Sequence, residues 1–217
     1  MKNGIDVGHL RSDDRIQCRL RPSGSNQPVP MSIDLPHRIH ILGASGSGTT
    51  TLGAALATKF GYVHLDTDDF YWMPTDPPFQ HARPIEERRE LMLPILETTP
   101  RWVLSGSLVS WGDLFIPLFD LVIYLWLPSD VRMQRLSDRE LARYGADALA
   151  SGGAMHENHT KFIEWAARYD DAGLEMRSRA RHEAWLATVG APVMRIDGLL
   201  PTERQIEYLC GALTDAR

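Results

Sequence analysis

The glycine-rich run from Gly43 to Thr50 constrains this 217-residue chain more than any other feature. It reads Gly-Ala-Ser-Gly-Ser-Gly-Thr-Thr and directly follows an apolar segment, Arg38–Leu42, that is typical of a buried strand. A segment with helical periodicity begins at Thr49. Glycine lets the backbone approach an anion closely, and the N–H groups at the start of a helix attract negative charge. The order strand, loop and helix therefore predicts a phosphate-binding loop.

One residue of this loop departs from the usual pattern. Thr49 stands where a lysine commonly reaches the β- and γ-phosphates. Thr50 keeps the hydroxyl that holds Mg2+ in such loops, and Thr51 is a substitute if the register slips. The missing lysine creates a need for a cation from elsewhere in the chain. We expect a nucleotide to be bound by Gly43, Ala44, Ser45, Gly46, Ser47, Gly48, Thr49, Thr50 and Thr51.

Short apolar runs alternate with longer helical segments along the rest of the chain. This alternation predicts a doubly wound α/β domain with a parallel sheet covered by helices. The expected strands are Arg38–Leu42, Tyr62–Leu65, Trp102–Ser105, Leu121–Leu127 and Pro192–Ile196. The expected helices begin near Thr49, Pro84, Ser129, Ala172 and Pro201.

Composition divides the chain into unequal parts. Residues 1–36 contain neither aromatic residues nor alanine, which predicts a disordered or loosely packed extension before a single domain at 37–217. Within that domain, residues 144–171 are polar and weakly periodic, and we expect them to form a mobile lid segment. The net charge of -5 argues against nucleic acid as a partner, and the lack of a long apolar run argues against a membrane. With only two cysteines, the chain is expected in the cytoplasm as a monomer or homodimer.

Acidic residues follow the second expected strand, in the run Asp66-Thr67-Asp68-Asp69. The carboxyl ends of parallel strands share one edge of a sheet, so these acids are expected beside the phosphate loop. A carboxylate there can hold Mg2+ or orient a substrate hydroxyl. The alternative is a solvated acidic turn that caps the next segment.

Arginines supply the candidate cations. Four of them lie on one face of the helix after Ser129, and we expect Arg139 and Arg143 to contact phosphate or adenine. Arg177 and Arg181, one helical turn apart, are expected to close over the substrate or the phosphoryl group. The remaining candidates for binding a phosphoryl acceptor are Arg83, in an aromatic-rich loop, and Gly106 and Ser107, after the third strand.

Taken together, Arg38 to about Arg217 resembles the P-loop small-molecule kinases, which include adenylate, cytidylate, shikimate and gluconate kinases. The spellings that carry the resemblance are Gly-Ala-Ser-Gly-Ser-Gly-Thr-Thr-Thr and Asp-Thr-Asp-Asp. The resemblance implies a five-stranded parallel sheet in the order 2-3-1-4-5, sandwiched by helices, with an arginine-bearing lid. It also implies that Thr50 and Asp66 hold Mg2+, while Asp68, Arg139 and Arg143 take part in catalysis.

The expected function is transfer of the γ-phosphoryl group of ATP to a small acceptor, most readily a nucleotide or nucleoside as in adenylate kinase-like proteins. Two alternatives stay open. One is a kinase of a small hydroxy acid or sugar acid. The other is an ATP-binding regulator that has lost transfer, because the loop lysine is absent and Ser105 replaces a common strand-end aspartate.

Overall fold

A parallel sheet of five strands, in the order β2-β3-β1-β4-β5, forms the centre of the computed structural model. The structure describes residues 35–215. The predicted sheet order and all five predicted strands are confirmed, with shifts of one residue at several ends. The strands are β1 (Arg38–Gly43), β2 (Val63–Asp66), β3 (Trp102–Ser105), β4 (Leu121–Trp126) and β5 (Val193–Asp197).

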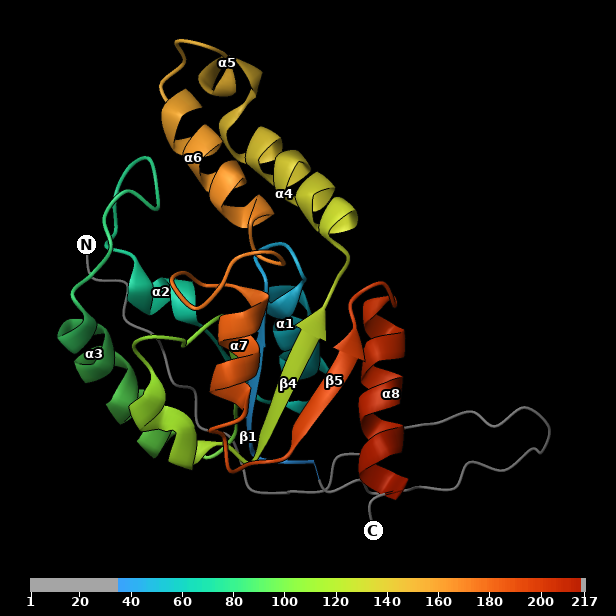
Figure 1. Ribbon diagram of the computed structural model, residues 1–217. Coiled ribbons are helices and arrows are strands. Elements are labelled where there is room, and N and C mark those ends of the chain that lie inside the picture. Colours follow the sequence, from blue (N-terminus) through green and yellow to red (C-terminus); the bar gives the residue numbers. More distant parts are fainter. Residues whose placement is uncertain (1–34, 216–217) are drawn as a thin grey trace.

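Helices cover both faces of this sheet (Figure 1). α1 and α8 lie on one face, whereas α3 and α7 lie on the other, and α4, α5 and α6 project beyond the carboxyl ends of the strands. The helices are α1 (Thr49–Phe60), α2 (Thr67–Tyr71), α3 (Ile85–Thr98), the 3-10 helix η1 (Asp113–Leu118), α4 (Ser129–Tyr144), α5 (Ala146–Leu149), α6 (His156–Ala167), α7 (Arg179–Leu186) and α8 (Thr202–Asp215).

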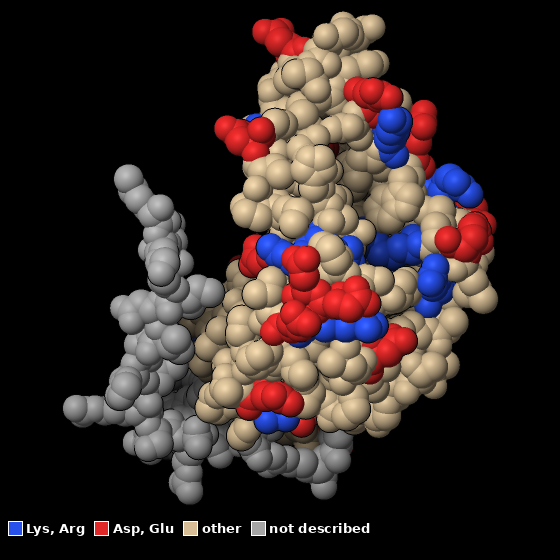
Figure 2. All heavy atoms as spheres, turned by 90° about the vertical axis from the view of Figure 1, so that its left-hand side faces the viewer, with Lys and Arg blue, Asp and Glu red and all other residues tan. Residues whose placement is uncertain are grey.

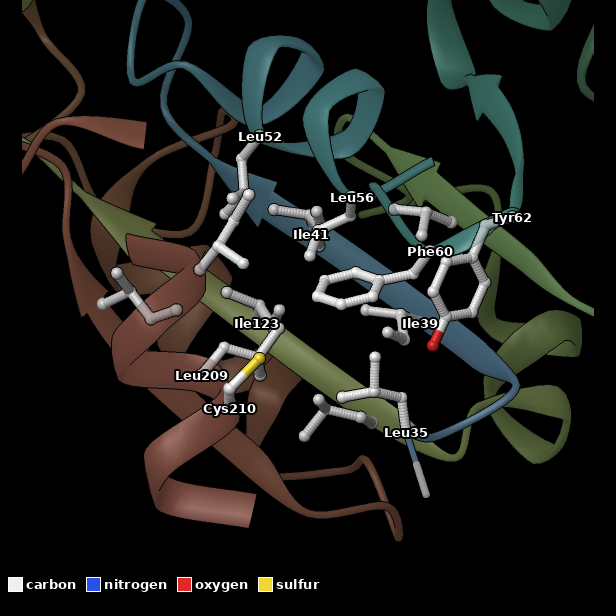
Figure 3. Close-up of a cluster of buried hydrophobic side chains, with 14 of the residues drawn as sticks. Leu35, Ile39, Ile41, Leu52, Leu56, Phe60, Tyr62, Ile123, Leu209 and Cys210 are labelled. Carbon is white, nitrogen blue, oxygen red and sulfur yellow. The ribbon is translucent and has the colours of Figure 1, made fainter. Parts of the chain in front are cut away.

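The alternation of side chains along β1 produces two hydrophobic cores. Ile39 and Ile41 point toward α1 and α8, where they meet Leu56, Phe60 and other side chains of the first core (Figure 3). Leu42 belongs to the second core, beneath α3 and α7. These two cores hold the carboxyl edge of the sheet in a fixed position, so the loops that follow β1, β2 and β3 start from a rigid base.

The amino-terminal boundary of the domain is only partly visible. Residues 1–34 of the predicted extension lie outside the described residues. Leu35 is buried in the first core, and the Tyr62 hydroxyl donates a hydrogen bond to the carbonyl of Pro36 at 2.6 Å. The ordered packing therefore includes the last two residues of the segment assigned to the extension.

The prediction that a helix begins near Ala172 was wrong. α7 begins at Arg179, because Ser178 caps it by accepting a hydrogen bond from the Arg181 N–H at 3.0 Å. Arg177 consequently lies in a loop rather than one turn from Arg181. Between residues 35 and 215, no helix combines the length and the apolar character needed to cross a membrane.

Candidate functional site

The predicted phosphate loop connects β1 to α1 and lines a cleft of about 1630 Å³ at the carboxyl edge of the sheet. Gly46 and Gly48 have φ angles of +82° and +99°, in the left-handed region that favours glycine. A Cβ atom on Gly46 would lie 2.9 Å from the Arg132 carbonyl, so a larger residue does not fit there. Within the described chain, the Gly46, Gly48 and Thr49 N–H groups have no backbone partner. These amides can bind an anion.

The pair predicted to hold Mg2+ lies together at this edge. The Thr50 hydroxyl donates to Oδ2 of Asp66 at 2.7 Å, and the Ser105 hydroxyl donates to the same oxygen at 3.1 Å. Asp66 also caps α2, because its Oδ1 accepts a hydrogen bond from the Asp68 N–H at 3.0 Å. Hydroxyl and carboxylate oxygens are the ligands that Mg2+ prefers, so these residues fit the ion.

Asp68 stands in the first turn of α2 and faces the cleft. Burial among the surrounding atoms raises the pKa of its carboxyl although water still reaches it, and the charge of Asp66 raises the pKa further. Arg177 and Arg139 act in the opposite direction. Opposing influences of this kind are common where a carboxylate accepts a proton during catalysis. The position agrees with the predicted contact between Asp68 and an acceptor.

Arg177 approaches the phosphate loop from the far side of the cleft. Its Nη2 donates to the Ser45 hydroxyl at 2.6 Å, and its guanidinium lies over the Trp165 ring at 4.6 Å. Desolvation lowers the pKa of Arg177, and no ion pair to a carboxylate forms within 4.0 Å among residues 35–215. The negative charge of Asp68 acts in the opposite direction and favours the protonated form of Arg177. A partly buried cation thus lies beside the loop that lacks a lysine.

Helical spacing predicted that the four arginines of α4 share one face. In the structure they do not all line the cleft. Arg132 is buried, pairs with Asp170 at 2.8 Å and donates to the carbonyl of Ala166 at 2.9 Å, which fixes α4 to the end of α6 and the turn after it. Arg139 and Arg143 line the cleft and share Oε1 of Glu140, at 3.5 and 3.4 Å. Figure 2 shows basic side chains gathered where the surface is hollowed between the projecting helices and the body.

The other predicted binding residues fall in different places. Gly106 and Ser107 line the cleft, and Gly106 is required because a Cβ atom there would overlap the Thr67 side chain. Arg83 donates to the carbonyl of Phe70 at 2.7 Å and borders a smaller neighbouring hollow instead. Arg181 is not among the residues that line the cleft.

Sequence reasoning missed Arg88, a buried arginine of α3 that lines the cleft. Its guanidinium lies 3.8 Å from the centre of the Tyr71 ring and 5.6 Å from that of Trp111. Its Nε donates to the carbonyl of Arg83 at 2.6 Å. Among the described residues no carboxylate lies within ion-pair distance of Arg88. The basic run Arg88-Arg89 was visible in the sequence, but its burial between two rings was not.

The lid segment is largely helical, since α5 and α6 both lie within it. It touches the loop before α3 where the Asn158 amide donates to Oε1 of Gln80 at 2.7 Å. Next to it, the guanidinium of Arg143 on α4 lies over the Phe79 ring at 4.7 Å. These contacts cover part of the cleft.

Comparison with known proteins gives the class first. The deoxyadenosine kinase from M. mycoides with bound dATP superposes with a TM-score of 0.51 at 15% identity, over 82% of this chain and 99% of that chain. With the strand order and the loop, this likeness shows the fold of the P-loop kinases. Shikimate kinase 2 of Serratia proteamaculans (strain 568) is 28% identical over 148 residues, which are 58% of this chain and 84% of that protein.

The particular family follows from a nearer relative. The uncharacterized protein YqaC of Bacillus subtilis (strain 168) is 50% identical over 159 residues, which cover 73% of this chain and 87% of that protein. The chain therefore belongs to the YqaC family. No protein-family model matches the sequence.

Proposed function

We propose that this protein transfers the γ-phosphoryl group of ATP to a small-molecule acceptor. The observation that carries the proposal is the meeting of a phosphate loop, the Thr50–Asp66 pair and Asp68 in one cleft. The P-loop fold supports nucleotide binding in general terms. The similarity of this fold to that of a deoxyadenosine kinase supports a kinase.

The proposed division of roles follows from the contacts. Backbone amides of the phosphate loop bind the β-phosphate, and Asp68 orients the acceptor hydroxyl and takes its proton. Thr50 and Asp66 hold Mg2+, which neutralises phosphate charge when it is bound. Arg177 supplies the cation that Thr49 does not, because its partly buried guanidinium already touches the loop through Ser45. Arg139 and Arg143 contribute further positive charge from the lid side of the cleft.

The lining of the cleft supports a nucleoside or nucleotide as the acceptor. Aromatic rings suit a planar base, and here they come from Tyr71, Trp72, Phe79, Trp111, Phe162 and Trp165. Arg88 lies among them with no acidic partner in the described chain, and a phosphate or carboxylate group of the acceptor would pair with it. A nucleoside monophosphate offers a ring, an anion for Arg88 and a sugar hydroxyl whose proton Asp68 can take as the phosphoryl group is transferred to that oxygen.

The test is acceptor-dependent release of ADP from ATP in the presence of Mg2+. The panel contains nucleosides, nucleoside monophosphates, shikimate and gluconate, and the phosphorylated product is identified by mass. Activity with a nucleoside monophosphate, lost in Asp68→Asn and kept in Asp138→Asn, supports the proposal; Asp138 is a matched control on the exposed face of α4. Activity restricted to a hydroxy acid overturns the choice of acceptor. ATP binding with no transfer to any compound overturns the kinase assignment.

A further inference from the structure

A chain of buried hydrogen bonds runs from the centre of the sheet to the cleft. The hydroxyls of Tyr124 on β4 and Tyr169 lie 3.0 Å apart. The Tyr169 hydroxyl lies 2.7 Å from Nδ1 of His182 on α7, and Nε2 of the same ring lies 2.9 Å from Oγ of Ser107. Ser107 is the only member that lines the cleft. Residues distant in sequence thus form a series of hydrogen bonds that ends at Ser107 in the wall of the cleft.

All four side chains are buried, with relative exposures of 3% for Tyr124, 4% for Tyr169, 0% for His182 and 7% for Ser107. Buried hydroxyl protons need acceptors, because leaving one unpaired costs about 1–3 kcal/mol. The hydrogen bonds must therefore run in the direction that leaves the one unpaired hydroxyl proton at the cleft, where a ligand or water can accept it, and not at the buried end.

The Tyr124 end of this series of hydrogen bonds determines the direction. Within the described residues, the Tyr124 hydroxyl has one hydrogen-bond partner, Tyr169. If the bonds ran from Ser107 toward Tyr124, the Tyr124 proton would have no acceptor in a buried position. If they run from Tyr124 toward Ser107, Tyr169 receives one bond and donates one to Nδ1 of His182. The proton of the imidazole is then on Nε2 and is donated to Ser107.

The imidazole of His182 must be neutral for these hydrogen bonds to form in this direction, since a protonated ring would donate at both nitrogens. Burial lowers the pKa of His182 to about 3, and the positive charge of Arg177 and the proximity of His40 act in the same direction. The groups around the ring are thus the partly buried Arg177 on the loop before α7, the buried His40 on β1 and the two tyrosines. Burial also raises the pKa of Tyr124 and of Tyr169, which keeps both hydroxyls protonated.

The geometry points to Ser107 as a hydrogen-bond donor that selects the acceptor substrate, with Tyr124, Tyr169 and His182 as positioning residues that fix its direction. Because Oγ of Ser107 accepts from His182, its own proton is left for a ligand in the cleft. The group opposite Ser107 must then offer a lone pair: a carbonyl, a carboxylate or phosphate oxygen, or a ring nitrogen. Asp68, in contrast, accepts a proton. A substrate in the cleft must therefore offer a hydrogen-bond donor to Asp68 and a lone pair to Ser107. This inference deepens the proposed function and rests on it.

The direct test is the tautomer of His182, measured by nitrogen-15 NMR on the full chain between pH 5.5 and 8. The chain contains eight histidines, so the signal is assigned by its loss in His182→Gln and by its shift in Ser107→Ala. We expect a pyrrole-like Nε2 and a pyridine-like Nδ1 across this range, retained in Tyr124→Phe because Tyr169 still donates to Nδ1. A pyrrole-like Nδ1 in the wild-type chain, alone or together with a pyrrole-like Nε2, overturns the inference.

The tautomer does not depend on phosphotransfer, so its outcome is distinct from failure of the proposed function. Where an acceptor is phosphorylated, Ser107→Ala should raise the KM for that acceptor about tenfold, the effect of one hydrogen bond, and leave the KM for ATP unchanged. Ser107→Thr, which keeps the hydroxyl, should restore most of this loss. An unchanged acceptor KM in Ser107→Ala overturns the donor role of Ser107.

Discussion

Replacing Arg177 by methionine should separate catalysis from stability. The variant loses a charged hydrogen bond to Ser45, worth about 1.5–3 kcal/mol, and a cation–π contact with Trp165, worth about 0.5–2 kcal/mol. It is also relieved of the desolvation of a partly buried charge that has no carboxylate within 4.0 Å in the described chain, a penalty of about 2–4 kcal/mol. These opposing effects are similar in size. We therefore expect the free energy of unfolding to change by no more than about 1 kcal/mol.

Turnover should fall far more, because a preorganised donor at the transferring phosphoryl group contributes about 10²–10³ in kcat. The assay measures kcat and KM by ADP release, with urea unfolding of the same preparation. Arg204→Met is the matched control: Arg204 pairs with Glu207 at 2.6 Å on the exposed surface of α8 and does not line the cleft. Wild-type turnover in Arg177→Met, or a loss of several kcal/mol of stability that accounts for lower activity, would refute the reasoning.

Three further substitutions test other parts of the site. Asp68→Asn should reduce kcat by about 10²–10⁴ and abolish the acidic limb of the pH profile; in the wild-type chain that limb should lie above the ordinary range of aspartate, since activity is lost as pH falls through the raised pKa of Asp68. Thr50→Ala should weaken the Mg2+-dependent affinity for ATP about tenfold, because its hydroxyl meets Asp66, whereas the exposed Thr58→Ala should leave calorimetric affinity unchanged. Arg132→Ala should lower the free energy of unfolding by about 3 kcal/mol in urea titration, because it leaves Asp170 without its partner; a loss below about 1 kcal/mol contradicts this.

Local patterns were sufficient to predict the sheet and the phosphate loop. The strand boundaries follow from short apolar runs, and the loop follows from glycines at positions that prove to need positive φ, Gly46 and Gly48. The shared edge of parallel strands also predicted that Asp66 would meet Thr50. In each case the information lies within a few residues of sequence or in one rule of sheet topology.

Tertiary contacts explain what the sequence did not reveal. Helical spacing placed Arg132 beside Arg139, but a buried partner, Asp170, comes from beyond α6 and is invisible to periodicity. The start of α7 was misplaced although Ser178 is a typical helix cap, so that signal was present and overlooked. The environment of Arg88 depends on two rings from separate segments, and no spacing rule predicts such a contact.

The account depends most on the ability of the loop after β1 to bind a polyphosphate without a lysine at Thr49. Titration calorimetry of the full chain with ATP, ADP and adenosine, each with Mg2+, measures this directly. We predict one site per chain that binds ATP and ADP but not adenosine. Absence of heat with both nucleotides, at protein concentrations where a micromolar dissociation constant gives a clear signal, would contradict the central claim.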